Sequence, residues 1–263
     1  MNQLQSSASK DPRIGVMITA SDAVVERDFA RFLPRDMSFH VARLMQPVDV
    51  QPGTLSNMDG IIAHVPEALR ALRVVEPDIV LFCCTSASFY RGPHWNVELD
   101  EQIAKDIGRP AISTSTALLK ALNAVMAKRL LLISPYPDHT NKTEAEFLES
   151  HGFTIVGTRA FDCKYSREIA EIQPARILSE IVDVHSGVPQ ADAILVSCTG
   201  LRSLEVAEEA ERRTGVPVLT SNMASLWMAL RHFGRDGDAV FKNALFGTSR
   251  AAPHVHTQAA ATR

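Results

Sequence analysis

Asp78-Ile-Val-Leu-Phe-Cys-Cys84-Thr85-Ser86 and Ala193-Ile-Leu-Val-Ser-Cys198-Thr199-Gly200 are the two stretches that decide the fold. Each is an apolar run of strand length followed by a cysteine, a threonine and a small residue. A continuous apolar run of this length is typical of a strand buried in a parallel sheet. Cys84 and Cys198 are 114 residues apart. The pair therefore predicts two copies of one unit, each with a thiol where a buried strand ends.

The rest of the chain repeats at nearly the same interval. Short β-rich runs alternate with longer amphipathic stretches, which is typical of an α/β protein with parallel sheets. Corresponding predicted strands start 116, 114, 115 and 106 residues apart. We therefore predict an α/β fold with two pseudo-symmetric αβα lobes, each with a mainly parallel four-stranded sheet, and the site between the lobes. The predicted strands are 13–19, 39–45, 78–84 and 110–114 in the first half, and 129–134, 153–161, 193–198 and 216–220 in the second.

The amphipathic stretches predict the helices, and several of these stretches stop at a glycine. The last one, 221–233, is expected to cross back and pack on the first lobe. The first lobe is then 11–115 plus 221–246 and the second is 116–220, with flexible tails at 1–10 and 247–263. The remaining predicted helices are 26–33, 67–75, 96–107, 116–128, 144–150, 169–184 and 203–213.

Composition excludes several classes of protein. The chain has 263 residues and a formal net charge of −3, and it shows no dense basic patch, so we expect no nucleic-acid partner. Its apolar runs are too short to cross a membrane, and the polar N-terminus has no apolar signal segment. Four cysteines in a chain of this length do not form a disulfide framework. We expect a cytoplasmic protein with reduced thiols.

Cofactor motifs are absent from the sequence. Nine histidines are scattered without a His-Glu-x-x-His or Cys-x-x-Cys pattern, so no metal site is predicted. No Gly-x-Gly-x-x-Gly follows a strand and no Walker motif is present, so a tightly bound nucleotide is not expected either.

Cys84 and Cys198 are the candidate catalytic residues. Ligands of open parallel sheets bind beyond the carboxyl ends of the strands, where both thiols are expected. Backbone N–H groups at such a turn can hold a carboxylate and favour the thiolate. One thiol can then attack carbon or remove a proton while the other donates one. The alternative is that each cysteine is a small apolar filler, the interpretation we give to Cys83. Cys163 has no partner in the repeat and is expected to be structural.

Other polar residues follow predicted strands at the same edge. Asp22 is a candidate base or hydrogen-bond acceptor, with a helix N-cap as the alternative. Tyr136 is a candidate donor to a substrate oxygen, with an amphipathic lid residue as the alternative. Residues 86–92 are predicted to be a polar, aromatic loop, in which Arg91 pairs with a carboxylate or is simply solvated.

These motifs resemble the aspartate/glutamate racemase superfamily, and most closely its branch of maleate cis-trans isomerases and arylmalonate decarboxylases. The resemblance covers roughly 13–234. It is carried by Cys84-Thr85-Ser86 with Ser88-Phe89-Tyr90-Arg91-Gly92, by Ser134-Pro135-Tyr136-Pro137, and by Ser197-Cys198-Thr199-Gly200.

The resemblance implies two lobes with the site between them and no metal or organic cofactor. It also implies that Cys84 adds to an alkene carbon as the nucleophile, that the new single bond rotates, and that Cys198 handles the proton as acid/base. The residues expected to hold carboxylates are then Thr85, Ser86, Tyr136, Thr199 and Gly200. In the decarboxylases a glycine stands at the position of Cys84, so the presence of both thiols argues against pure decarboxylase chemistry.

Asp22 departs from the pattern, because the isomerases usually carry an asparagine there that binds a substrate carboxylate. An ionised aspartate would repel a dicarboxylate unless it were protonated or paired. The substrate is therefore a dicarboxylate facing a neutral or paired Asp22, or a molecule with an amino or amide group, or one with a single carboxylate.

Together these observations predict a cofactor-independent isomerase that acts on a small carboxylate or dicarboxylate, most like maleate isomerase. The alternatives are an amino-acid or hydantoin racemase, an arylmalonate-type decarboxylase, and a non-catalytic small-molecule binding protein. The oligomeric state is left open, with a homo-oligomer among the options.

Overall fold

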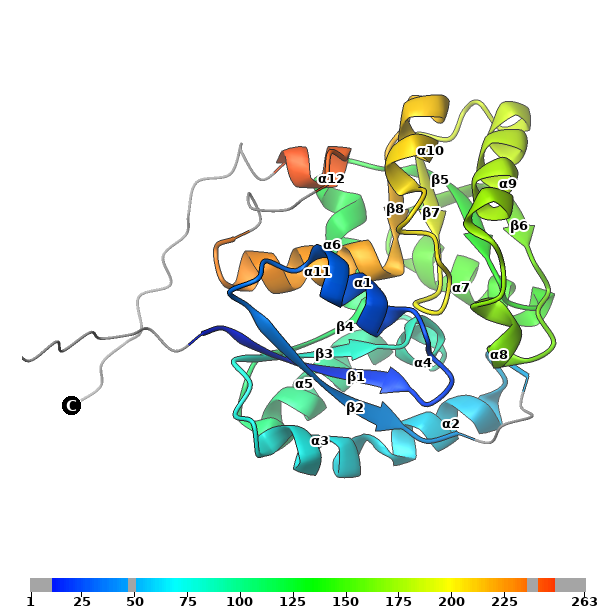
Figure 1. The fold of residues 1–263 in the computed structure, drawn as a ribbon. Helices are drawn as coiled ribbons and strands as arrows, with labels where there is room; N and C mark the ends of the chain where they lie inside the picture. The colour runs from blue at the N-terminus through cyan, green and yellow to red at the C-terminus, as the bar shows by residue number, and fades with distance from the viewer. Residues whose placement is uncertain (1–10, 47–50, 236–240, 249–263) are drawn as a thin grey trace, which may run out of the picture.

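Two four-stranded sheets, each entirely parallel, form the framework of the protein (Figure 1). The computed structural model describes residues 11–46, 51–235 and 241–248. The strand orders are β2-β1-β3-β4 and β6-β5-β7-β8, so the second sheet repeats the order of the first. The strands are β1 (Arg13–Thr19), β2 (Ser38–Leu44), β3 (Ile79–Cys83), β4 (Ala111–Ser113), β5 (Arg129–Ser134), β6 (Thr154–Ala160), β7 (Ala193–Val196) and β8 (Val218–Thr220).

All eight strands match the sequence prediction to within two residues at each end. The predicted α/β class with two four-stranded parallel sheets is therefore confirmed. The two apolar runs that precede Cys84 and Cys198 became β3 and β7, which are buried along their whole length. Cys83 is fully buried among the apolar side chains that the two sheets share, as expected of a core residue. Cys84, the next residue, belongs to a separate apolar cluster under α2, α3 and α5 of the first sheet.

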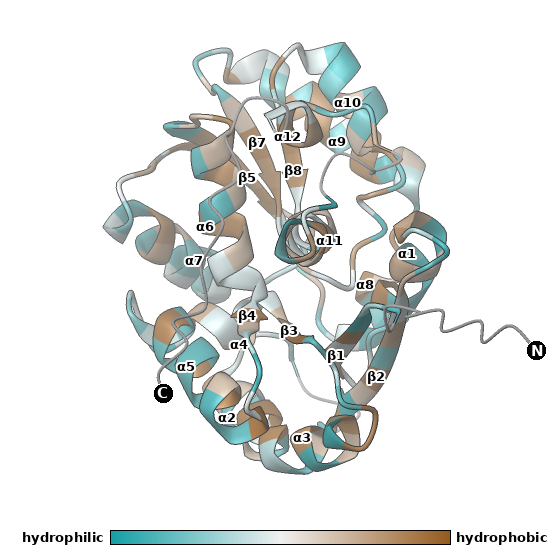
Figure 2. Ribbon diagram, turned by 90° about the vertical axis from the view of Figure 1, so that its left-hand side faces the viewer, coloured by the Kyte–Doolittle hydropathy of each residue, from teal (hydrophilic) through white to brown (hydrophobic). Residues whose placement is uncertain are grey.

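Helix α11 (Ser221–His232) lies between the two sheets, where Figure 2 shows it end-on. It leaves the carboxyl end of β8 and packs against β3, β4 and α6 (Thr114–Ala124). Every side chain from Ser221 to Leu230 is buried. The helix contacts β3 and β4 of the first sheet and β8 of the second, so α11 brings residues of both sheets together.

Some predicted helices have different boundaries. The prediction of a single helix over 169–184 is wrong, because the segment divides into α8 (Ser166–Ile169) and α9 (Pro174–Gly187). Proline lacks an N–H and disfavours helical backbone in the residue before it. Gln173 is accordingly extended, with φ −68° and ψ 140°. The helix predicted over 116–128 ends at Ala124, and Met126 then turns the chain with φ 58°.

Residues 85–89 form a helix, so the prediction of a loop over 86–92 is wrong for its first half. Ser88 donates to the Thr85 carbonyl and its hydroxyl lies 2.6 Å from that of Ser115, which lets a hydroxyl-rich segment be buried as a helix. The remaining helices are α1 (Val25–Phe32), α2 (Leu55–Ala63), α3 (Val65–Arg73), α4 (Thr85–Phe89), α5 (Trp95–Ile107), α7 (Asp138–Ser150), α10 (Ala207–Thr214) and α12 (Ala244–Gly247).

The predicted tail 1–10 and residues 249–263 of the predicted tail 247–263 lie outside the described residues. The first two residues of the second tail are described, because Gly247 ends α12 and Thr248 is its C-cap. Within the described ranges no helix is both long and apolar enough to cross a membrane.

Candidate active site

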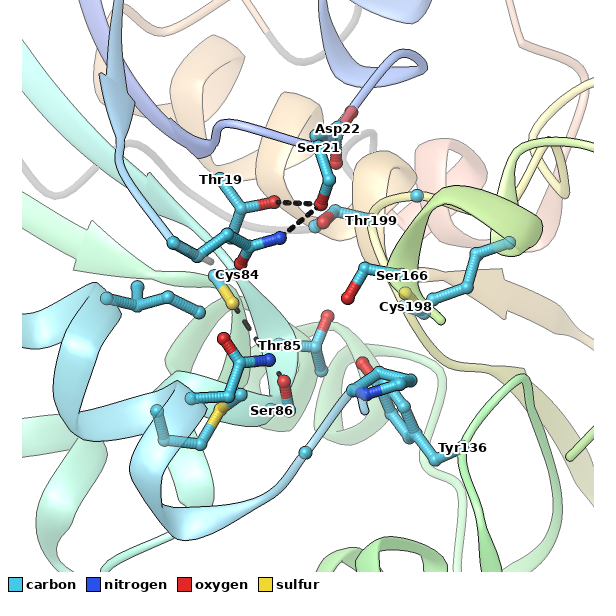
Figure 3. A pocket seen from close by; sticks show the side chains of 18 of the residues that line it. Thr19, Ser21, Asp22, Cys84, Thr85, Ser86, Tyr136, Ser166, Cys198 and Thr199 are labelled. Carbon is cyan, nitrogen blue, oxygen red and sulfur yellow. Dashed lines mark hydrogen bonds between the residues drawn. The ribbon is translucent and has the colours of Figure 1, made fainter. Parts of the chain in front are cut away.

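A cavity lies between the two sheets at the carboxyl ends of their strands (Figure 3). Its empty volume is about 460 Å³, part of it open to solvent. In each sheet the polar loops follow the two central strands, β1 and β3 or β5 and β7. The strand order reverses direction between these central strands, and this is where open α/β sheets bind ligands. Two such crevices therefore face each other across one cavity.

Cys84 enters the cavity from the first sheet. It follows β3 in an extended conformation as the N-cap residue of α4. Its Sγ lies 3.9 Å from Ser86 Oγ. Burial raises the pKa of the Cys84 thiol to about 11, while hydrogen bonds from the Ala87 N–H and the Ser86 hydroxyl act in the opposite direction. These donors stabilise the thiolate relative to the same thiol buried without partners.

Cys198 enters from the second sheet, on the other side of the cavity in Figure 3. Its φ of 102° is a conformation that side-chain-bearing residues rarely adopt. Such strain costs on the order of 1–3 kcal/mol and is retained where the surroundings enforce it. Burial raises the pKa of Cys198, and hydrogen bonds from the Tyr136 hydroxyl and the Gly200 N–H lower it. Gly200 also leaves space beside the sulfur, because a Cβ there would lie 3.8 Å from Sγ and 3.3 Å from Ile169.

A chain of hydroxyl groups joins the two cysteine loops. Thr85 donates to Ser221 Oγ at 2.9 Å, and the Cys198 N–H donates to the same oxygen at 3.0 Å. The Thr199 hydroxyl donates to the Cys83 carbonyl across the lobes at 3.4 Å. The hydroxyl groups therefore hold the two thiol-bearing turns in a fixed relation.

Asp22 is buried at the cavity wall and is tied up by protein donors. Its Oδ1 accepts the Val24 and Val25 N–H groups at 2.8 and 2.9 Å, which caps the start of α1. The Thr199 side chain also bonds to its carboxyl group. Burial raises the pKa of Asp22 despite these bonds and the nearby Arg43. The N-cap residue of α1 is Val24, so Asp22 is not the N-cap itself, although it accepts the N–H groups at the helix start. The raised pKa favours the neutral acid.

Tyr136 is positioned by the turn that follows β5. The Tyr136 N–H donates to Ser134 Oγ at 3.0 Å, and Asn141 Nδ2 donates to the Tyr136 carbonyl at 3.1 Å. Its ring packs edge-on against Phe89 of α4. Burial raises the pKa of Tyr136 well above its usual value, so its hydroxyl keeps its proton at neutral pH and can donate a hydrogen bond.

The structure brings all eight candidate residues of the sequence analysis around this one cavity. Arg91 is directed elsewhere, because it pairs with Asp59 at 2.7 Å. Cys163 is not among the described residues that line the cavity. Among the residues the structure describes, no cluster of three or more His, Cys, Asp or Glu side chains is placed to hold a metal ion.

Several cavity residues were missed by sequence reasoning. Asn57 lies on α2, a helix that was not predicted, and its buried Oδ1 has no hydrogen-bond partner among the described residues. Ser166 and Ile169 come from α8, whose separation from α9 was also missed. Ser221 lies behind the cavity, and its position in the sequence could have indicated this. It directly follows β8, as Thr114 directly follows β4 in the first repeat, and so lies at the carboxyl end of a strand.

Comparison with known proteins identifies the family of the chain. The family model for arylmalonate decarboxylase matches residues 14–246. Arylmalonate decarboxylase of Bordetella bronchiseptica is 32% identical over 223 residues, which are 85% of this chain and 91% of that protein. Maleate isomerase of Nocardia farcinica is 29% identical over 229 residues, 83% of this chain and 89% of that protein.

A solved structure shows the same fold. It is a cysteine-to-serine variant of the Nocardia farcinica maleate cis-trans isomerase with a covalently bound succinylcysteine intermediate. It superposes with a TM-score of 0.81 at 22% identity and covers 89% of this chain and 98% of its own. These relatives are enzymes. The chain belongs to the arylmalonate decarboxylase family, in the branch of the aspartate/glutamate racemase-like superfamily that includes the maleate isomerases.

Proposed function

We propose that the protein is a cofactor-independent isomerase that acts on a small carboxylate through two thiols, with cis-trans isomerisation of maleate as the leading reaction. The observation that carries the proposal is the placement of Cys84 and Cys198 on opposite sides of one cavity, each at the end of a central strand. A small unsaturated acid between them is within reach of a nucleophile and of a proton donor.

The cavity suits carboxylates through neutral donors. Its described lining contains no Lys, Arg or His. Thr85, Ser86, Tyr136 and Thr199 line it instead. The hydroxyl groups of Thr85, Tyr136 and Thr199 bond to protein acceptors here and turn from them to donate to a bound carboxylate. Hydrogen bonds to an anionic acceptor are about twice as strong as those between neutral groups. Because burial favours the neutral form of Asp22, that residue repels a dicarboxylate less than an exposed aspartate would.

The reaction follows from these positions. The Cys84 thiolate forms a C–S bond to one alkene carbon, and the π electron pair moves to the other carbon and its carboxylate. Cys198 supplies a proton to that carbon. The former double bond is now a single C–C bond, and rotation about it moves the two carboxylates from the cis to the trans arrangement. Cys198 then removes a proton and the C–S bond breaks, which restores the double bond. Both thiols return to their starting state, and no oxidant or reductant is needed.

The test is a substrate screen with matched variants. Maleate, aspartate, glutamate, hydantoins and phenylmalonate are incubated with the wild type, Cys84→Ser, Cys198→Ser and, as a control, Cys163→Ser. We expect fumarate from maleate with the wild type and with Cys163→Ser only. Turnover of maleate that survives in both active-site variants would contradict the proposal.

Racemisation is tested in the same screen. If the screen is run in D2O, a racemase incorporates deuterium at the α-carbon of recovered aspartate, glutamate or hydantoin, whereas maleate isomerisation is read from fumarate.

Decarboxylation is the second candidate function, because the Bordetella arylmalonate decarboxylase is the more similar of the two relatives compared. In that reaction one thiol suffices, to protonate the enediolate left by loss of CO2. Cys84→Gly separates the two functions. A decarboxylase keeps releasing CO2 from phenylmalonate in this variant and stops in Cys198→Ser, whereas an isomerase loses fumarate formation in both.

A further inference from the structure

Glu144 is a buried acidic side chain that the proposed chemistry leaves unused. It lies on the inner face of α7 and is 1% exposed. Its Oε1 accepts a hydrogen bond from Ser197 Oγ at 2.5 Å. Its Oε2 is buried without a hydrogen-bond partner among the described residues. Burying a carboxyl group with one partner is costly, and such groups in native proteins call for an explanation.

The partner of Glu144 connects it to the active site. Ser197 lies between β7 and Cys198, the thiol in the rare backbone conformation. Its N–H donates to the Ile133 carbonyl of β5 at 2.8 Å, and its hydroxyl donates to Glu144. The Cys198 N–H is held in turn by Ser221. Glu144 therefore fixes one side of the strained turn, and Ser221 fixes the other.

Glu144 is also electrically coupled to Tyr136. Burial raises the pKa of Glu144 to about 8, and only the Ser197 hydrogen bond opposes this. A charge on Glu144 raises the pKa of Tyr136, whose hydroxyl donates to Cys198. Ionisation of Glu144 thus adds negative charge behind the residue that stabilises the Cys198 thiolate.

The neighbouring elements offer no compensating charge. Helix α4 contains no charged residue, and the one charged residue of β6, Arg159, is paired with Glu180. The other charged residues of α7 and its histidine are exposed, and none shifts the pKa of Glu144. Besides Tyr136, the titratable groups coupled to Cys198 are Asp22 and Cys84, and both oppose its ionisation.

We propose that Glu144 is a positioning residue for Cys198, holding the turn through Ser197 in its neutral form and limiting activity at alkaline pH once it ionises. This inference rests on the proposed two-thiol function. We expect ionisation of Glu144 to lower activity, because its negative charge then acts on Tyr136, the residue that donates a hydrogen bond to Cys198, whereas a neutral Glu144 adds no charge there.

Glu144→Gln tests the charge with little change in shape, and Glu146→Gln is the matched control. Glu146 lies on the exposed side of the same helix, 3.9 Å from Lys142. The readouts are the pH profile of kcat for maleate and the rate of iodoacetamide alkylation of Cys198, followed by peptide mass spectrometry from pH 6 to pH 10. Alkylation needs no substrate, so it reports on Glu144 even if the proposed reaction is wrong.

We expect the wild type to lose activity as the pH rises through about 8. In Glu144→Gln this loss is absent, and Cys198 is alkylated about tenfold faster than in the wild type near pH 9, equivalent to a shift of about one pKa unit. Glu146→Gln follows the wild type in both readouts. A Cys198 profile that is the same in Glu144→Gln and the wild type overturns the proposal. If the alkylation profile of Cys198 shifts in Glu144→Gln but neither the wild type nor any variant turns over maleate, the role of Glu144 is supported and the proposed function is contradicted.

Ser197→Ala provides a second test if Glu144→Gln fails to fold. Removing the one hydrogen bond that favours ionised Glu144 raises its pKa, so the alkaline loss of activity and the slowing of Cys198 alkylation move to higher pH. An unmoved alkaline limit in Ser197→Ala would also overturn the proposal.

Discussion

The Cys84 loop and the Cys198 loop follow equivalent strands of two similar sheets but hold their thiols differently. Cys84 is an extended N-cap residue in front of α4, and its hydrogen-bond partners come from its own loop and helix. Cys198 has a positive φ, lies in a turn, and depends on Tyr136, Ser197 and Ser221 for its surroundings. One repeat thus presents its thiol at a helix start, and the other surrounds its thiol with side chains from several elements.

This difference favours separate roles for the two cysteines. Burial raises the pKa of both thiols, and more strongly at Cys198. Cys84 is therefore the easier thiol to ionise, which suits a nucleophile. Cys198 retains its proton more readily and has the hydrogen-bonding hydroxyl group of Tyr136 beside it, which suits a residue that gives and takes a proton. The two sheets share one strand order, but the surroundings of their cysteines differ.

The largest expected effect comes from removing either sulfur. In Cys84→Ser and Cys198→Ser we expect kcat for the preferred substrate to fall by about 10³-fold or more, because serine at the same place is a far weaker nucleophile and acid. Steady-state rates measure the loss, with Cys163→Ser as the control that keeps wild-type rates. A fall in only one of the two variants would mean that the loops do not act as a pair.

The next effect tests the dependence of Cys198 on Tyr136. In Tyr136→Phe the hydrogen bond to the thiolate is lost, so the pKa of Cys198 rises and kcat falls by about 10- to 100-fold. Iodoacetamide alkylation of each cysteine across pH separates the loops, since Cys198 should slow while Cys84 is unchanged. Ser86→Ala is the counterpart on the other loop and should slow Cys84 alone. Equal changes at both cysteines in either variant would contradict the comparison.

A smaller effect concerns the tether between the lobes at the Cys198 loop. Asn222 Nδ2 donates to Asp28 Oδ2 at 2.8 Å and to the Thr199 carbonyl at 2.9 Å. Burial raises the pKa of Asp28 to about 7. Because the folded state then binds a proton that the unfolded state has released, stability decreases as the pH rises from about 4 to 7. The loss is on the order of 2–4 kcal/mol.

Asp28→Asn should remove that part of the pH dependence while keeping an acceptor for Asn222. Urea unfolding at pH 5 and pH 8 measures it, and we expect the difference between the two conditions to be smaller in Asp28→Asn than in the wild type. An equal difference in the two proteins would show that Asp28 is already ionised in the folded state at pH 5.

The sequence was enough to locate the framework and the thiols, because long apolar runs report buried parallel strands and strand ends report the ligand side of the sheets. It could not place α2 or α4. α4 is a buried helix made largely of hydroxyl-bearing residues, which are stable there because of contacts such as Ser88 with Ser115. The sequence also could not show the hydrogen bond from Tyr136 to Cys198 or the one from Ser197 to Glu144. The partners are 53 or more positions apart in the sequence and meet only in the folded chain.

The most direct test of Cys84 as nucleophile and Cys198 as acid/base is mass spectrometry of Cys84→Ser and Cys198→Ser after incubation with maleate, on the intact proteins and on their peptides. We predict that Cys198→Ser gains the mass of one substrate on Cys84, because the C–S bond still forms but the later proton transfer and cleavage of the adduct are impaired. We predict that Cys84→Ser gains no such mass. An adduct on Cys198 in Cys84→Ser, with Cys84 unmodified in Cys198→Ser, would contradict the assignment.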